Sequence, residues 1–345
     1  MIGGEKMDRG MTLLVTGGAG FIGSNFVRYM LEQYPDYRII NLDKLTYAGN
    51  LENLRTIEDN PNYKFIKGDI INRELVEYIF AEYGVNYVIN FAAESHVDRS
   101  IEEPDIFIKT NIMGTQVLLD IAKKYWLDKS EIQNERLRAT KFIQISTDEV
   151  YGSLGEEGNF TEDTPLAPNS PYSSSKTGAD LVARAYYKTF GLPVNITRCS
   201  NNYGPYQFPE KLIPFFLTNA LYDKELPLYG DGKNVRDWLH VKDHCRAIDL
   251  VLHEASSGEL YNIGGNNEMT NLKITEIILQ ELDKPTSLIK LVEDRLGHDR
   301  RYAIDASKIK SELGWEPRYT FNEGIKATIK WYLDNKEWWQ PLRIS

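Results

Sequence analysis

The stretch TLLVTGGAGFIGSNF, Thr12–Phe26, joins a short apolar run to a glycine-rich turn and then to a segment with helical periodicity. The apolar run is typical of a buried strand, and Gly17, Gly20 and Gly23 are spaced as G-x-x-G-x-x-G between that strand and the helix. Glycines at these positions permit a tight turn and let backbone N–H groups approach a pyrophosphate at the helix N-terminus. The stretch therefore predicts the first strand–turn–helix unit of a dinucleotide-binding fold.

Further strand candidates alternate with helical stretches along the first two hundred residues. The strand candidates are Thr12–Gly17, Tyr37–Asp43, Tyr63–Asp69, Asn86–Ala93, Lys141–Thr147 and Pro193–Ser200. The longest helical candidates are Pro104–Trp126 and Pro171–Phe190. Repeated strand–helix units predict an α/β fold with a doubly wound, Rossmann-type parallel sheet. Ligands of such sheets bind at the carboxyl ends of the strands.

The pattern changes after about Gly204, where prolines and glycines interrupt the segments. We therefore divide the chain into a flexible tail (1–10), an NAD-binding Rossmann-type domain (11–203) and a smaller, mixed C-terminal lobe (204–345). The last part mainly binds substrate, and we expect the chain to cross between the two lobes.

Composition and charge exclude several classes of protein. The net charge is −10 and no Lys/Arg-rich run occurs, so the chain has no electrostatic footprint for nucleic acid. No apolar run reaches membrane-spanning length. Cys199 and Cys245 are too few for a disulfide framework, which favours reduced thiols in a cytoplasmic protein. His240 and His244 are spaced i and i+4, with Cys245 directly after His244, but no acid or further ligand completes a metal site, and we expect no metal.

Two acids follow the next strands and suggest how a dinucleotide would be held. Asp43 ends the second strand, twenty residues beyond Gly23, where a carboxylate binds the adenosine ribose hydroxyls and repels a 2′-phosphate. This favours NAD over NADP, although Lys44 follows directly. Asp69, at the end of the third strand, either reaches the adenine or caps a helix.

The stretch NSPYSSSK holds a tyrosine and a lysine at helical spacing. Ser170 can cap a helix with Pro171 at its first position, which makes Tyr172 and Lys176 neighbours on one face. The ammonium group should lower the pKa of the phenol, and a phenolate can take the proton from an alcohol as its hydride leaves. The alternative is an ordinary helix surface.

Two adjacent acids stand where a strand ends in FIQISTDEVYG, Phe142–Gly152. Thr147, Asp148 and Glu149 follow the apolar run, so they should face a ligand at the carboxyl edge of the sheet. Repulsion and different surroundings can push the two carboxyl pKa values apart, which suits one proton donor and one proton acceptor. The alternative is a pair of acids that caps a loop or helix.

Several stretches resemble, in order, the extended branch of the short-chain dehydrogenase/reductase superfamily. They are VTGGAGFIGSNF, NLDKLTYAGN, AAESHVDRSI, STDEVYG, PYSSSK, CSNNYGPYQFPEKLIP, RDWLHVKDH and DRLGHDRRYAID. Within that branch the chain is similar to the dTDP-glucose 4,6-dehydratase family, from about Met11 to Tyr332. Leu296 stands where the family pattern has proline, and His240 where an aromatic such as tyrosine is common.

The resemblance implies an internal oxidation and reduction of dTDP-glucose through bound NAD. Tyr172 and Lys176 would oxidise carbon 4, with Thr147 hydrogen-bonded to the hydroxyl on that carbon. Glu149 would remove the proton on carbon 5, and Asp148 would protonate the departing hydroxyl of carbon 6. The product would be dTDP-4-keto-6-deoxyglucose, and NAD would stay bound.

The resemblance also implies binding residues. For the cofactor they are Gly17, Gly20, Phe21, Ile22, Gly23, Asp43, Lys44, Thr46, Asp69, Ile70, Ala92, Ala93, Ser95, Thr110, Tyr172, Lys176 and Asn202. For the substrate they are Ser95, Thr147, Asn201, Lys211, Leu212, Pro227, Tyr229, Arg236, Asn271, Arg295 and His298.

The resemblance further implies a homodimer that pairs the helices Pro104–Trp126 and Pro171–Phe190. The apolar positions expected at the interface are Val117, Leu118 and Ile121 on the first helix, and Leu181, Val182 and Tyr186 on the second. Two alternatives to the dehydratase remain open: another NAD-dependent nucleotide-sugar enzyme, such as an epimerase or a dehydratase for a different base, and a nucleotide sensor without catalysis.

Overall fold

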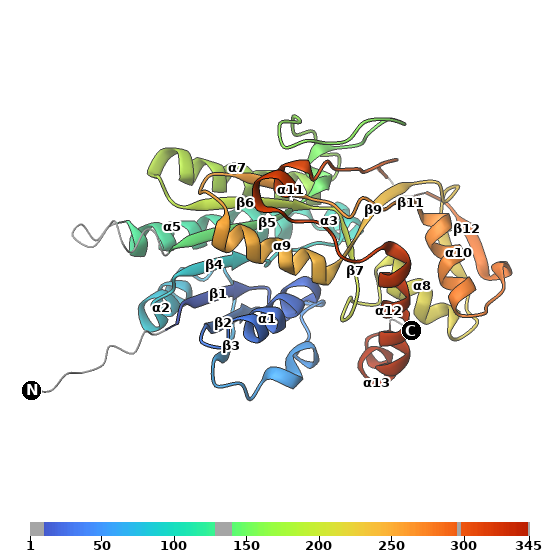
Figure 1. Cartoon of the computed structure of the whole chain (residues 1–345), viewed down its shortest axis with the longest axis horizontal. Helices are drawn as coiled ribbons and strands as arrows, with labels where there is room; N and C mark the ends of the chain where they lie inside the picture. The colour runs from blue at the N-terminus through green and yellow to red at the C-terminus, as the bar shows by residue number, and fades with distance from the viewer. Residues whose placement is uncertain (1–9, 128–139, 295–297, 344–345) are drawn as a thin grey trace, which may run out of the picture.

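The computed structural model describes residues 10–127, 140–294 and 298–343 (Figure 1). Its centre is a seven-stranded sheet in the order β10-β6-β5-β4-β1-β2-β3. The strands are β1 (Thr12–Thr16), β2 (Arg38–Asp43), β3 (Tyr63–Lys67), β4 (Tyr87–Asn90), β5 (Lys141–Thr147), β6 (Val194–Cys199) and β10 (Leu260–Ile263). Every pair in this sheet is parallel, which confirms the predicted doubly wound fold.

The strands agree with the apolar runs, with one addition. β5 occupies the predicted range Lys141–Thr147, whereas β4 ends at Asn90, three residues before the predicted end. The strand β10 was not predicted, and it comes from the C-terminal half of the chain to pair with β6. The tail 1–9 lies outside the described residues, and the division of the chain at residue 203 stays a prediction.

Helices cover both faces of the sheet. One face carries α1 (Phe21–Gln33), η1 (Leu51–Ile57), α9 (Val241–Glu254) and α11 (Ser307–Leu313), and the other carries α2 (Arg73–Tyr83), α5 (Thr115–Trp126) and α7 (Pro171–Phe190). Leu13 of β1 packs into the first of the two cores and its neighbour Leu14 into the second, because successive side chains of a strand point to opposite faces. The sheet is therefore buried on both sides, as continuous apolar strands require.

The helix predicted at Pro104–Trp126 is three successive pieces. They are α4 (Pro104–Phe107), a π-helical segment η2 (Ile108–Gly114) and α5. The wider turn brings Asn111 against the neighbouring elements, where its Nδ2 donates to Glu94 O over 3.1 Å and to Ser175 Oγ over 2.8 Å. Such π-helical insertions occur frequently at functional sites.

A second, smaller lobe lies at the carboxyl edge of the main sheet. It contains a three-stranded sheet of β7 (Asn201–Tyr203), β9 (Val235–His240) and β11 (Glu268–Thr270), and a parallel pair of β8 (Leu226–Tyr229) and β12 (Ile289–Val292). Its helices are α8 (Leu212–Ala220), α10 (Asn271–Glu281), α12 (Phe321–Asp334) and α13 (Lys336–Trp339). Figure 1 shows α10 beside β12 at one end of the molecule, with α8 next to them and α12 above α13 near the C-terminus. The remaining short turns are α3 (Val97–Glu102), η3 (Asp148–Tyr151), η4 (Thr286–Leu288) and η5 (Gln340–Leu342).

A polar cluster, the Asp249 cluster, ties α1 to α9 on the outer face of the main lobe. Asp249 accepts hydrogen bonds from Tyr29 over 2.7 Å and Tyr34 over 2.8 Å, and its Oδ1 lies 2.8 Å from His253 Nδ1. Burial acts to raise the pKa of Asp249, but these hydrogen bonds outweigh it and lower the pKa. The cluster therefore stabilises the ionised carboxylate.

No helix in the ranges that the structure describes is both long enough and apolar enough to span a membrane.

Candidate active site

The glycine-rich turn opens into a cavity of about 340 Å³ at the carboxyl ends of the main strands. Loops after β1, β2, β4, β5 and β6 contribute to its wall, as expected for a doubly wound sheet. Every residue that the sequence assigned to the cofactor, from Gly17 to Asn202, lines this first pocket. Their assignment to a cofactor stays a prediction, but the fold brings all of them together.

The turn has the geometry that a pyrophosphate needs. Gly17 has φ +69°, and a Cβ added there would lie 2.7 Å from the backbone nitrogen of Ala92. A Cβ on Gly23 would lie 2.3 Å from Gly17 O. The helix α1 begins after Gly20, which has no side chain to cap it, so its first N–H groups are left for a ligand. These residues fit the diphosphate of a dinucleotide.

The acids after β2 and β3 are held by backbone and side-chain contacts. Asp43 is buried and accepts hydrogen bonds from the amides of Ala19 over 2.9 Å and Leu45 over 2.8 Å. Lys44 forms an ion pair with Asp69 over 2.8 Å, so the carboxylate of Asp69 neutralises the lysine charge next to Asp43. Asp69 does not cap α2.

The cap of α2 is instead Asn72, whose side chain accepts from the amide of Leu75 over 3.1 Å. Asp69 accepts from the amide of Ile71 over 3.0 Å and lines the pocket, so the helix cap is wrong and a contact with the adenine stays a prediction.

The acid pair stands at the end of β5, in the short turn η3. Asp148 is only 2% exposed, and its Oδ2 has no hydrogen-bond partner among the described residues, while Oδ1 accepts from Thr147 Oγ1 over 3.2 Å. Burial, followed by the charges of Glu149 and Asp237, raises the pKa of Asp148 well above its usual range. Asp148 therefore retains its proton to a higher pH than an ordinary carboxyl group, next to a second carboxyl group.

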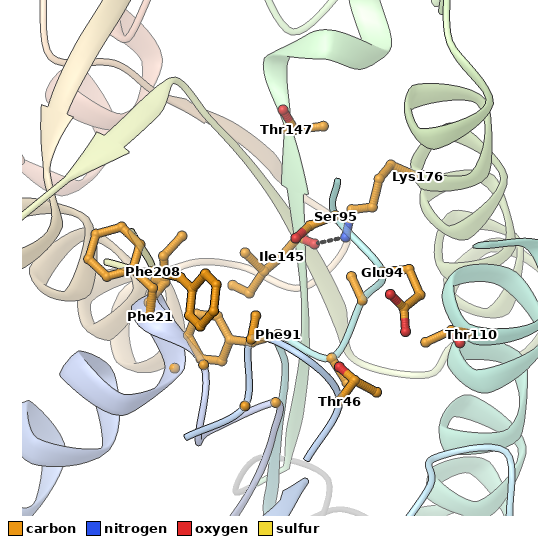
Figure 2. Close-up of a pocket in the computed structure, with 18 of the residues that line it drawn as sticks. Phe21, Thr46, Phe91, Glu94, Ser95, Thr110, Ile145, Thr147, Lys176 and Phe208 are labelled. Atoms are coloured by element: carbon orange, nitrogen blue, oxygen red, sulfur yellow. Dashed lines mark hydrogen bonds between the residues drawn. The ribbon is translucent and has the colours of Figure 1, made fainter. Parts of the chain in front are cut away.

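The helix α7 presents Tyr172 and Lys176 to the same pocket. Ser170 and Ser173 form a capping box with Pro171 in the first turn, so the predicted start of the helix is confirmed. Lys176 is buried, and its Nζ donates to Ile145 O of β5 over 2.6 Å, the dashed contact in Figure 2. The lysine thereby links α7 to the strand that carries the acids.

One electrostatic expectation is wrong in this structure. The sequence predicted that Lys176 lowers the pKa of Tyr172, whereas burial and the charge of Glu149 raise that pKa well above its usual value. Burial also lowers the pKa of Lys176. The reason is that both side chains lie in a dry site close to the acid pair, and burial disfavours both charged forms.

A second pocket of about 600 Å³ continues from the first toward the smaller lobe. The two share Ser95, Glu149, Asn201, Glu210 and Lys211, so Glu149 stands where they meet. The predicted substrate residues Leu212, Pro227, Tyr229, Arg236, Asn271 and His298 line the second pocket, while Thr147 lines only the first. Arg295 and the sequence departure at Leu296 lie outside the described residues.

Several residues that line the first pocket were missed from the sequence. Glu94, Tyr47, Phe91, Phe208, Glu210 and Cys199 all belong to its wall. Figure 2 shows Phe21, Phe91 and Phe208 on one side of the cavity and Glu94 with Thr110 on the other. Burial raises the pKa of Cys199 to about 12, which keeps it a neutral thiol. Glu94 and Tyr47 stand in stretches that carried the family resemblance, and that was the available signal.

The histidines that suggested a metal are held by other contacts. The His240 ring stacks on Tyr319 with centroids 4.1 Å apart, and His244 Nδ1 lies 3.0 Å from Asn202 Oδ1. Burial lowers the pKa of His240 to about 4 and of His244 to about 3. Among the described residues, no group of three or more His, Cys, Asp and Glu side chains could hold a metal ion.

The parallel sheet, the glycine turn and the buried Tyr–Lys pair together define a protein of the short-chain dehydrogenase/reductase type. A family model described as GDP-mannose 4,6 dehydratase matches residues 14–328. A dTDP-glucose 4,6-dehydratase of Xanthomonas campestris is 55% identical over 96% of this chain and 95% of its own length. One from Escherichia coli is 53% identical over 96% of each chain. The chain belongs to the dTDP-glucose 4,6-dehydratase family.

Solved structures agree. The dTDP-glucose 4,6-dehydratase of Bacillus anthracis in complex with NAD has a TM-score of 0.88 at 58% identity, covering 96% of this chain and 100% of that one. A UDP-glucose 4-epimerase of Thermotoga maritima has a TM-score of 0.85 at 32% identity, covering 94% and 100%. The fold is therefore shared with epimerases, and the residues of the site distinguish the activities.

Proposed function

We propose that this protein is an NAD-dependent hydro-lyase that converts dTDP-glucose to dTDP-4-keto-6-deoxyglucose and water. The observation that carries the proposal is the pair Asp148–Glu149, with a buried Asp148 whose pKa is raised, at the point where the two pockets meet. An epimerase oxidises and rotates its sugar and has no use for such a pair. The curated relatives with the same architecture are named for this dehydration.

The first pocket is suited to NAD rather than NADP. The glycine turn leaves room for the diphosphate, and the carboxylate of Asp43 would accept from the ribose hydroxyls. Lys44 is paired with Asp69, so it offers little attraction to a 2′-phosphate. When bound, NAD supplies the acceptor for the hydride of carbon 4 and the donor that returns it to carbon 6.

The Tyr172 side chain, in its phenolate form, would take the proton of the hydroxyl on carbon 4. Lys176 fixes the helix face that carries Tyr172 through its contact with Ile145 O. Thr147, at the carboxyl end of β5, would hydrogen-bond the same hydroxyl. Because burial and Glu149 raise the pKa of Tyr172, the phenol has to release its own proton to solvent before it can act as the base, and the positive charge of a bound nicotinamide would favour that phenolate.

The two acids divide the elimination between them. The Glu149 carboxylate borders both pockets and would remove the proton on carbon 5, which the ketone at carbon 4 acidifies. Asp148, whose pKa burial raises, would donate its proton to the departing hydroxyl of carbon 6. The proton gained by Glu149 and the one lost by Asp148 balance the release of one water, and Glu149 would return its proton to carbon 5 when the hydride reaches carbon 6.

The second pocket would bind the nucleotide. Lys211 and Arg236 supply cations for the diphosphate, and Arg236 is suited to bidentate contacts with phosphate oxygens. Tyr229 is 42% exposed and borders the same pocket, where its ring offers a surface for the base.

Direct assay of four nucleotide sugars tests the proposal. The purified protein is incubated with dTDP-, UDP-, CDP- and GDP-glucose, and the products are read by mass spectrometry and by the alkaline absorbance of a 4-keto sugar. We expect loss of one water from dTDP-glucose, and Glu149→Gln as a matched control should abolish it. An epimerised sugar without loss of water would assign the chain to the epimerases. Binding without turnover of any of the four would assign it to nucleotide sensors.

We also propose a homodimer through η2 and α7, on residues that differ in part from those predicted. Val117, Leu118 and Ile121 are buried in the core of the main lobe, because α5 packs these side chains against the sheet and α2, so they are not free to pair. Val182 and Tyr186 pack partly against the same core.

The exposed apolar side chains on these two segments include Ile108, Met113 and Leu181, at 46%, 50% and 52% exposure. The segments η2 and α7 are in contact, so these side chains belong to neighbouring surfaces. A two-fold pairing of helices would bury them. Sedimentation of Leu181→Glu should give a monomer, whereas Leu333→Glu, on the exposed side of α12, should not change the mass. A wild-type monomer at micromolar concentration would contradict the dimer.

A further inference from the structure

Arg236 on β9 is held in place before any substrate binds. Its side chain lines the second pocket, yet the residue is only 5% exposed. Its Nη1 donates to Val235 O over 2.7 Å, and its Nη2 donates to Asp299 O over 2.9 Å. The guanidinium carbon lies 4.3 Å from the centroid of the Tyr302 ring, which is within the range of a cation–π contact. The guanidinium is therefore fixed by one ring and two carbonyl groups.

Tyr302 and Asp299 are themselves fixed. Tyr302 is 3% exposed, and its hydroxyl donates to Asp299 Oδ2. Asp299 Oδ1 accepts from Asn169 Nδ2 over 2.7 Å, in the loop that precedes α7. The side chain of Asp299 thus holds Tyr302 and the main lobe, while its backbone carbonyl holds Arg236. Neither Tyr302 nor Asp299 is among the described residues that line the second pocket.

Both residues lie in the segment 299–305, which forms backbone hydrogen bonds with each of the two lobes. On one side, Tyr302 N donates to Val235 O over 3.1 Å, next to Arg236 on β9. On the other side, Phe160 N donates to Ala303 O over 2.9 Å, in the loop that follows the acid pair. Since backbone bonds from both sides fix the segment, the Tyr302 ring has a set position between β9 and the end of β5.

The acid pair is close to this arrangement. Burial and then the charge of Glu149 raise the pKa of Tyr302, which keeps its phenol neutral and able to donate to Asp299. Arg236 in turn acts against the rise in the pKa of Asp148. One guanidinium therefore faces the substrate pocket and also influences the carboxyl group at the reacting centre.

We propose that Tyr302 and Asp299 are positioning residues that hold the guanidinium of Arg236 ready for the diphosphate of the substrate. They act through the ring face, the phenol–carboxylate bond and the Asp299 carbonyl, and they do not touch the substrate. This inference rests on the proposed function, because it requires a nucleotide diphosphate in the second pocket. A cation fixed in advance loses less conformational freedom on binding, so its fixing residues strengthen binding without a contact of their own.

Binding and kinetics of five proteins test this role. They are the wild type, Tyr302→Leu, Tyr302→Phe, Arg236→Met and the double variant Tyr302→Leu/Arg236→Met. The Kd of dTDP is measured by calorimetry, and kcat and KM are measured with dTDP-glucose. Tyr261→Phe is the matched control, since its hydroxyl also donates to a carboxylate, that of Glu312, and Tyr261 is outside both pockets.

Tyr302→Leu removes the ring beneath the guanidinium and should weaken dTDP binding about 2- to 30-fold, the range of a cation–π contact. Tyr302→Phe keeps the ring but not the bond to Asp299, so its loss should be smaller. The loss should appear in KM and Kd more than in kcat. In the Arg236→Met background, Tyr302→Leu should cause little further loss, since two residues that act through one contact are not additive.

Two results would overturn the inference while leaving the proposed function intact. One is a folded Tyr302→Leu protein that binds dTDP as tightly as the wild type. The other is a full additional loss in the double variant, which would mean that Tyr302 does not act through Arg236. If Tyr302→Leu does not fold, the Tyr302→Phe protein is the test instead. A Kd of dTDP for Tyr302→Phe that equals the Kd for Tyr261→Phe would then contradict the positioning role of Tyr302. A wild-type protein that binds no dTDP would overturn both proposals.

Discussion

Replacing Asp148 by asparagine tests whether this carboxyl group is neutral in the folded protein. Asparagine is similar in size and can still accept the hydrogen bond that Thr147 Oγ1 donates over 3.2 Å. It can neither ionise nor give up a proton. The variant therefore removes the titration of Asp148 while leaving the packing at the end of β5 nearly unchanged.

The expected magnitude follows from the raised pKa. In the unfolded chain this carboxyl loses its proton at about pH 3.9. In the folded chain, burial and the charges of Glu149 and Asp237 preserve the proton to a higher pH. Between the two pKa values the free energy of unfolding of the wild type falls by about 1.4 kcal/mol per pH unit. Asp148→Asn lacks this loss. As the pH rises, its free energy of unfolding relative to the wild type should therefore increase at that rate, and then level off above the folded-state pKa.

Urea unfolding of both proteins at several pH values between about 4 and 7 measures the difference. A difference that stays constant over this range would show that Asp148 ionises as an ordinary carboxyl does, and would refute the neutral proton donor. In the same preparations, turnover of dTDP-glucose should fall about 100- to 10,000-fold while the first oxidation is retained. A variant with wild-type turnover would remove Asp148 from the elimination, and one that loses carbon 5 exchange would reverse the roles of the two acids.

Glu149→Gln should retain the absorbance of reduced nicotinamide after mixing with dTDP-glucose but lose exchange of the carbon 5 proton with deuterated water about 100- to 10,000-fold, whereas Tyr172→Phe should not show the absorbance at all. Gly17→Ala should carry less nucleotide, released on denaturation, than Gly155→Ala. The added Cβ at Gly17 would lie 2.7 Å from backbone, while at Gly155 nothing lies within 4 Å, and equal contents would contradict this fit. Asp249→Asn should lower the free energy of unfolding by about 1–3 kcal/mol at neutral pH. The lowered pKa of Asp249 places this stabilisation above the ordinary carboxyl pKa, so the deficit should shrink as the pH falls, and urea unfolding curves with a constant deficit in acid would count against the Asp249 cluster.

The main sheet was predictable because each of its first six strands is a nearly continuous apolar run that ends in glycine or polar residues. β5 and α7 have the predicted bounds, and α7 has a serine cap and a proline in its first turn. The strand β10 was missed because it is four residues long, Leu260–Ile263, and follows β7, α8, β8 and β9 of the second lobe. Periodicity cannot assign so short a strand to a sheet that begins far earlier in the chain.

The candidate site was predictable as far as it depends on strand ends. Ligands of parallel sheets bind at the carboxyl ends of the strands. From this rule the sequence alone predicted that Asp43, Asp69 and the acid pair lie close together. The charge states of the site were harder to predict from the sequence. The pKa of Tyr172 is raised by burial and by the charge of Glu149, and the spacing of Tyr172 and Lys176 gives no information about either. The turn of η2 was not visible either, because a π-helical insertion leaves the pattern of apolar residues nearly helical.

The position of β10 has a consequence for how the protein is made. When a ribosome synthesises the chain, β1 through β6 emerge first, but the strand that covers the open side of β6 is more than sixty residues further on, at Leu260–Ile263. Until then the nascent main lobe exposes the edge of β6, with unpaired backbone groups that can join a foreign strand. The main sheet can therefore be completed only after part of the second lobe has been synthesised. Truncation anywhere before Leu260 should yield an aggregation-prone fragment rather than an isolated cofactor-binding domain.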